Sequence, residues 1–131
     1  MIVVDTTVIA YLHIPGDRTQ AARAVFREDP NWAAPLLWRS EFRNVLVLYM
    51  REGSLSLAAA RGLARKAESL LMGREHLVDT AAVLELAARS ACSAYDCEFV
   101  ALARELGVSL LTADREILAA FPGDARALGE I

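Results

Sequence analysis

The sequence contains few of the residues that crosslink small secreted proteins or bind zinc. It has two cysteines and two histidines in 131 residues. Cys92 and Cys97 lie five positions apart, a spacing that matches neither a zinc knuckle nor a redox pair, and His13 and His76 are scattered. We therefore expect no zinc site, and we expect both cysteines to be small buried hydrophobic residues.

Long apolar segments are also missing. No uncharged apolar run approaches the roughly 20 residues that a membrane helix needs. Asp5 interrupts the N-terminal run before it could serve as a secretory segment. We expect a cytoplasmic protein that has no membrane contact.

Positive charge is scarce as well, since the net charge is −3. This balance argues against non-specific nucleic-acid binding through a basic face, but it permits a polyanionic substrate that is held through metal ions. All basic residues except Lys66 are arginines. The excess of arginine has two explanations, biased codon usage or recognition of phosphate, and both stay open.

The residues that are present predict a packed α/β domain. Hydrophobic residues make up 55% and charged residues 24% of the chain, and no linker or repeat interrupts it, so residues 1–131 form one expected domain. Alternating strands and helices predict a central parallel sheet with helices on both faces. The expected strands are 2–4, 32–34, 76–78, 108–111 and 126–128. The expected helices are 6–15, 18–28, 36–52, 57–72, 81–89, 93–106 and 115–121.

Two acids lie at or just beyond the carboxyl ends of expected strands. Asp5 comes after the β-branched run Ile2–Val4, and Asp114 lies just beyond the strand that ends at Leu111. Ligands of parallel sheets gather at the carboxyl ends of the strands, which makes both acids candidate site residues. The alternative is that each acid only complements the positive N-terminus of the next helix.

Glu41 lies within the apolar stripe of the long helix. Its neighbours on the same face of the helix are Leu37, Trp38 and Val45, three or four positions away, and Leu48, seven positions away. A buried carboxylate costs several kcal/mol unless it is paired, protonated or bound to metal. Glu41 is therefore a candidate ligand, with an ion pair to Arg39 or Arg43 as the alternative.

Asp96 has a local explanation, because Ser93 and Asp96 have the spacing of a helix capping box. However, a first-turn position that faces the carboxyl edge of the sheet also suits a fourth ligand. Four neighbouring carboxylates repel one another unless protons or divalent cations neutralise them. A set of oxygen ligands favours Mg²⁺ or Mn²⁺ over zinc.

Four segments, in this order and spacing, resemble the PIN-domain ribonucleases, in particular the small VapC toxins of VapBC toxin-antitoxin modules. The segments are Val3–Ile9, Ser40–Leu46, Ser93–Ala103 and Leu110–Arg115. The resemblance covers nearly the whole chain and implies a single PIN-like domain.

The resemblance also assigns roles to the acids. It implies a metal site of Asp5, Glu41, Asp96 and Asp114, in which Asp5 and Asp96 are the most direct ligands. Thr112 matches a hydroxyl residue that helps to order this site. Thr7 stands where serine is more usual, and Glu98 is an additional acid whose simplest interpretation is a solvated helix face.

The implied activity is metal-dependent hydrolysis of RNA with Mg²⁺ or Mn²⁺, by a toxin that forms homodimers and binds a VapB-like antitoxin. One rival is a phosphoaspartate enzyme, but its motif needs a second aspartate where this chain has Thr7. The other rival is a catalytically inactive PIN-fold module that serves in binding or regulation. The presence of all four acids argues against that loss of activity.

Overall fold

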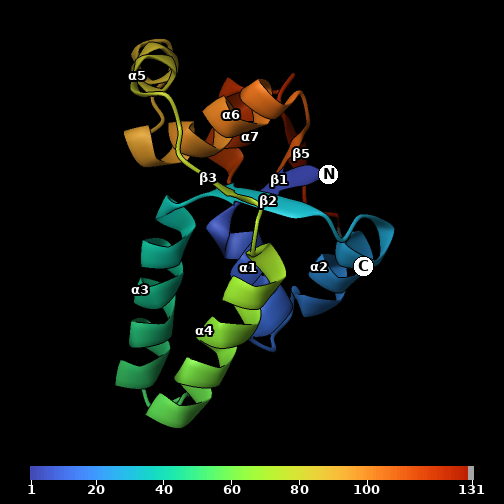
Figure 1. Ribbon diagram of the computed structural model, residues 1–131, viewed down its shortest axis with the longest axis vertical. Helices are drawn as coiled ribbons and strands as arrows, with labels where there is room; N and C mark the ends of the chain where they lie inside the picture. The colour runs from blue at the N-terminus through green and yellow to red at the C-terminus, as the bar shows by residue number, and fades with distance from the viewer. Residues whose placement is uncertain (130–131) are drawn as a thin grey trace.

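The computed structural model describes residues 1–129, in which five parallel strands form one sheet between two layers of helices (Figure 1). This arrangement confirms the expected α/β fold class. The strands, in the spatial order β3-β2-β1-β4-β5, are β1 (Ile2–Val4), β2 (Trp32–Pro35), β3 (Glu75–His76), β4 (Leu110–Thr112) and β5 (Ala125–Ala127). The helices are α1 (Thr6–His13), α2 (Thr19–Glu28), α3 (Leu37–Arg51), α4 (Leu57–Leu71), α5 (Thr80–Ala88), α6 (Ala94–Leu106) and α7 (Arg115–Ala120).

Strand β1 occupies the centre of the sheet, between β2 and β4. Its three residues are buried, as expected for a β-branched run that is covered on both faces. Val3 pairs with Ala33 on one side and with Leu110 on the other. Because the strands are parallel, their carboxyl ends meet at one edge, and Asp5 lies at the middle of that edge.

The two helical layers differ in shape (Figure 1). Helices α1 to α4 lie on one face of the sheet, where α3 and α4 pack together and extend away from it, and α5 to α7 cover the other face. The Trp38 and Phe42 rings of α3 lie 5.8 Å apart in the core. No helix within residues 1–129 has the length and apolar character needed to cross a membrane.

A tight turn at the C-terminus of helix α6 leads into strand β4. Gly107 takes φ 68°, the left-handed conformation that favours glycine, and the N–H of Val108 donates to the carbonyl of Ala103. Val108 therefore belongs to the end of the helix, and β4 begins at Leu110, two residues later than expected.

Strand β3 is Glu75–His76, shorter and earlier than the expected 76–78. The carbonyl of His76 accepts from the N–H of Leu36 just beyond β2, and the next residue, Leu77, is 82% exposed as the chain turns toward α5. The remaining elements begin and end within two residues of the expected positions, which is the usual uncertainty of helix and strand ends.

The two cysteines flank the start of α6. Cys92 is 6% exposed and Cys97 is 0% exposed, and both are free thiols in the hydrophobic core. The prediction that they are buried apolar residues is confirmed.

Candidate active site

Asp5 is held by a residue from the neighbouring strand. Its Oδ2 accepts a hydrogen bond of 2.7 Å from the hydroxyl of Thr112, the last residue of β4, which pairs with β1. Asp5 occupies the N-cap position of α1, yet its carboxylate makes no capping hydrogen bond there. Asp5 therefore stands at the N-terminus of α1, as the alternative expects, and has in addition a hydrogen-bond partner on β4.

Thr112 connects two of the acids. Its side chain is fully buried, its hydroxyl donates to Asp5, and the same oxygen accepts from the N–H of Asp114 at 3.0 Å. A buried hydroxyl that both donates and accepts has little freedom to rotate. Thr112 therefore fixes the Asp5 carboxylate relative to the chain at Asp114.

Glu41 is half-buried on α3, and its Oε1 accepts a hydrogen bond of 2.7 Å from the hydroxyl of Thr6. Arg39 pairs instead with Glu75, at 2.7 Å, and with Glu68. Neither Arg39 nor Arg43 forms an ion pair with Glu41 in the described part of the chain, so the ion-pair interpretation of Glu41 is wrong.

Asp114 is the N-cap of α7. Its Oδ1 accepts from the backbone N–H groups of Glu116 at 2.8 Å and Ile117 at 3.1 Å. The expected helix-end role is therefore confirmed for this acid. The hydrogen bonds described for Asp114 leave its second carboxylate oxygen available.

Asp96 lies in the first turn of α6, after the N-cap Ser93. The Ser93 hydroxyl oxygen accepts from the N–H of Asp96 at 3.1 Å, which is one half of the expected capping box. The other half, from the Ser93 N–H to the Asp96 carboxylate, is absent among the hydrogen bonds of residues 1–129. The cap therefore positions the Asp96 backbone without occupying its carboxylate.

The charges of the four acids act on one another. Burial is the main reason that the pKa of Asp5 is raised, the hydrogen bond from Thr112 opposes this, and the charges of Asp96 and Asp114 raise the pKa further. Burial likewise raises the pKa of Glu41, with added contributions from Asp5 and Asp96. The fold thus brings the four acids predicted from the sequence into one electrostatic environment.

Two residues of this environment were not identified from the sequence as site residues with a role. Thr6 orients Glu41, which lies 35 residues further along the chain. No local sequence pattern predicts a contact over that separation. Glu98 is half-buried rather than fully solvated, and its charge contributes to the raised pKa of Glu41. Burial raises the pKa of Glu98 itself. Glu98 is therefore a fifth carboxylate at the margin of the site.

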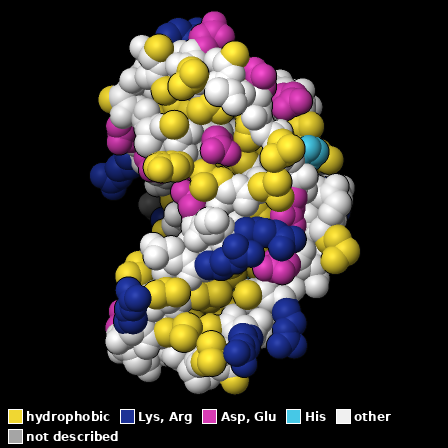
Figure 2. Space-filling view, turned by 60° about the vertical axis from the view of Figure 1, so that its left-hand side comes forward, with side chains coloured by type: hydrophobic (Ala, Val, Ile, Leu, Met, Phe, Trp, Pro, Cys, Tyr) yellow, Lys and Arg dark blue, Asp and Glu magenta, His cyan; other side chains and the backbone are white. Residues whose placement is uncertain are grey.

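The acids are neighbours without forming a closed ligand cage. Within residues 1–129, no three His, Cys, Asp or Glu side chains converge closely enough to hold an ion as they stand. The face that α3 brings forward mixes acidic side chains, a band of Lys and Arg, and apolar areas (Figure 2). It has no uniformly basic surface, in line with the net charge of −3.

Comparison with known proteins gives the same picture. The model of the PIN domain family matches residues 2–122. Ribonuclease VapC3 of Pyrobaculum aerophilum is 31% identical over 127 residues, which cover 92% of this chain and 95% of the relative.

Two solved structures show the same fold. The P. aerophilum protein PAE2754 matches with a TM-score of 0.75 and 24% identity, over 97% of this chain and 90% of the other. A toxin-antitoxin complex from Klebsiella pneumoniae contains a chain that matches with a TM-score of 0.73 and 18% identity, over 100% of both chains. From the family match and the curated relative, we conclude that this chain belongs to the PIN-domain family, among its VapC ribonucleases.

Proposed function

We propose that this chain is a metal-dependent endoribonuclease and the toxin of a toxin-antitoxin pair. The observation that carries the proposal is the set of Asp5, Glu41, Asp96 and Asp114 at the carboxyl edge of the sheet, where their charges influence one another. The relative named as a ribonuclease supports the same conclusion.

The residues suit Mg²⁺ or Mn²⁺. The donors are carboxylate oxygens, with Asp5 and Asp96 as the most direct ligands and Glu41 and Asp114 completing the set. Glu41 and Asp114 each use one oxygen in the hydrogen bonds described, so one remains for a cation.

A bound cation would supply positive charge to the RNA phosphate and make water a stronger nucleophile. The chain's own residues would hold the cation and orient its carboxylate ligands. Thr112 directs the Asp5 carboxylate, and Thr6 directs that of Glu41. Both threonines are buried, so these orientations are set before substrate binds.

The inactive-module alternative is disfavoured by the same geometry. The buried hydroxyl groups of Thr112 and Thr6 orient the carboxylates of Asp5 and Glu41. Burial raises the pKa values of both carboxyl groups. Such an arrangement costs stability in a domain that does not use it, because ionised carboxylates are desolvated and close to one another.

We also propose a homodimer that binds a VapB-like antitoxin. Leu36, Leu77 and Leu84 line a hollow of about 320 Å³ beside the site, and they are 42%, 82% and 61% exposed. Exposed apolar clusters of this kind typically mark protein interfaces. Light scattering at micromolar concentration should give twice 14.3 kDa, and Leu84→Arg should return the mass to that of one chain.

The activity is tested with a fluorescently labelled single-stranded RNA. Cleavage should require added Mg²⁺ or Mn²⁺, stop with EDTA and be abolished by Asp96→Asn. Asp79→Asn is the matched control, because Asp79 caps α5 in the way that Asp114 caps α7 but is not one of the four acids. Cleavage that persists in EDTA or in Asp96→Asn contradicts the proposal.

A further inference from the structure

A second hollow lies on the opposite flank of the acids, along the groove between α1 and α3. Its volume is about 360 Å³. Thr7, Tyr11 and the loop before α2 form one wall, and Val45 and Tyr49 of α3 form the other. Two of the three tyrosines of the chain therefore line one groove.

This hollow begins next to the site. Thr7 follows Thr6, the residue that orients Glu41, and Val45 lies one helical turn after Glu41 on α3. Tyr49 lies one turn further, so it is about 12 Å from Glu41 along the helix at 1.5 Å per residue. A nucleic-acid strand with one phosphate at the acids would pass along this groove with its next nucleotides.

The side chains of the groove suit RNA. Single-stranded bases stack on aromatic rings and on arginine planes. Tyr49 is 36% exposed, and the guanidinium of Arg18 lies 5.6 Å from the centre of the Tyr11 ring.

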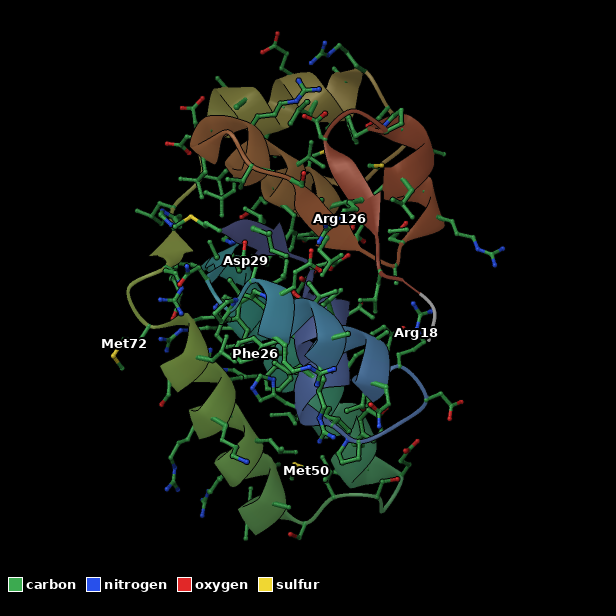
Figure 3. The ribbon with its side chains drawn as sticks, turned by 90° about the vertical axis from the view of Figure 1, so that its right-hand side faces the viewer. Arg18, Phe26, Asp29, Met50, Met72 and Arg126 are labelled. Atoms are coloured by element: carbon green, nitrogen blue, oxygen red, sulfur yellow. The ribbon has the colours of Figure 1, made fainter. Side chains whose placement is uncertain are left out.

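Arg18 is also fixed in place. Its Nη2 donates to the carbonyl of Leu128 at 3.1 Å, and Figure 3 shows the side chain at the start of α2 beside the end of the described chain. The other guanidinium N–H groups can donate to phosphate. Asp17, which also lines the hollow, can accept from the amino group of a base.

The hollow on the other flank suits RNA less well. It is lined by leucines and by Glu98, whose negative charge already acts on Glu41. Both hollows carry one carboxylate, Glu98 in one and Asp17 in the other, but only the α1–α3 groove also offers an arginine, Arg18. The arginine therefore distinguishes the two flanks.

We propose that the groove between α1 and α3 binds the nucleobases of single-stranded RNA next to the cleaved bond, with Tyr11 and Tyr49 as stacking partners and Arg18 as a phosphate contact. This inference rests on the proposed ribonuclease function and adds the path of the substrate. Tyr11, Tyr49 and Arg18 are specificity-determining residues under this proposal, while the four acids carry the chemistry.

The first test measures cleavage of a labelled single-stranded RNA by Tyr49→Ala, Tyr49→Phe and Tyr95→Ala. Tyr49→Ala should lose about tenfold in kcat/KM, mainly through KM, because one stacking contact is removed. Tyr49→Phe keeps the ring and should stay close to wild type, which also controls for folding. Tyr95 is the third tyrosine and is 62% exposed beside Asp96, so Tyr95→Ala should change kcat/KM less than twofold.

The second test locates the bases directly. An RNA with a single 4-thiouridine is photo-crosslinked to the full chain carrying Asp96→Asn in the presence of Mn²⁺, and the modified peptides are identified by mass spectrometry. Crosslinks should fall within residues 7–18 or 45–49.

The outcomes separate this proposal from the ribonuclease function. If wild-type protein cleaves RNA but Tyr49→Ala cleaves equally well, or if crosslinks map to Tyr95 or to residues 76–84, the groove proposal is overturned and the function stands. If Tyr49→Ala only weakens inhibition by an antitoxin peptide, the groove is a protein-binding surface and the proposal is also wrong. If the wild-type protein does not cleave RNA, the proposed ribonuclease function is wrong. Crosslinks outside the groove would in that case also contradict the proposal that the groove binds bases.

Discussion

Asp5 and Glu41 each accept a hydrogen bond from a threonine on another element, whereas Asp96 and Asp114 lie in the first turns of helices that are capped locally. We call Asp5 and Glu41 the anchored pair, and Asp96 and Asp114 the capped pair. The anchored pair depends on contacts across 107 and 35 residues of chain, and the capped pair on contacts across two or three. One site is thus built partly by the fold and partly by helix ends, and the two parts should respond differently to mutation.

The largest effect is expected from removing one ligand charge in each pair. Asp5→Asn and Asp96→Asn should both lose more activity than the roughly 10- to 100-fold that is typical when an outer partner of a metal site is mutated. The comparison lies in stability. Asp5→Asn removes a buried carboxylate that Asp96 and Asp114 repel. Without metal, the free energy of unfolding of this variant should therefore rise by about 1 kcal/mol, which corresponds to a melting temperature a few degrees higher.

Thermal melts in EDTA check this prediction, with Asp96→Asn as the partner measurement. Asp96 is not held by a buried side chain, so its variant should shift the melting temperature less than Asp5→Asn does. Equal shifts in both variants would show that anchoring does not distinguish the two pairs.

Removing the group that connects the pairs should have the next largest effect. Thr112→Val keeps the shape but leaves the Asp5 carboxylate and the Asp114 N–H without their hydrogen-bond partner. We expect a loss of about 10- to 100-fold in kcat and about 1–3 kcal/mol in the free energy of unfolding. Thr112→Ser should recover most of the activity. A serine variant as inactive as the valine variant would show that the methyl group, not the hydroxyl, matters.

Smaller effects are expected when the hydroxyl that orients Glu41 and the hydroxyl that caps α6 are removed separately. Thr6→Val removes the hydrogen bond that orients the Glu41 carboxylate. It should reduce RNA cleavage clearly but change the free energy of unfolding little, because Glu41 is only half-buried. Ser93→Ala removes the cap of α6 and should cost about 1 kcal/mol with a change in activity of only a few fold. Urea unfolding and RNA cleavage measured on both variants test this; the reverse ranking contradicts the distinction between the two pairs.

The smallest effect concerns pH. Because the pKa values of Asp5 and Glu41 are raised, the folded state binds more protons than the unfolded state between about pH 4 and those pKa values. Their contribution to the free energy of unfolding therefore falls as pH rises through this window and stays low above it. Mn²⁺ should restore stability at neutral pH but not at acid pH, where the ligands are protonated.

Other carboxylates contribute with the opposite sign, at lower pH. Asp29 and Glu75, for example, have pKa values lowered by their cationic partners. The prediction therefore applies to the difference between wild type and Asp5→Asn in EDTA. That difference should grow from pH 4 upward, and a difference that is constant with pH would contradict the raised pKa of Asp5.

Periodicity and turn residues predicted most of the fold. The β-branched run at residues 2–4 and Gly107 act through neighbouring residues, as do the N-cap side chains of Asp79 and Ser93, so their structures follow from local sequence. Strand β3 was misplaced because its two residues are defined by pairing with β2, which no local pattern encodes.

The acids divide in the same way. The sequence by itself determined which carboxylates are candidates, because an acid after a buried strand or within an apolar stripe is costly and so marks a site. Only the tertiary structure decided what holds them: that Thr112 holds Asp5, that Thr6 rather than an arginine holds Glu41, and that Glu98 adds its charge. These contacts join residues far apart in the chain, and their partners are chosen by the register of parallel strands and the packing of α3 on α1, which exist only after the chain has folded.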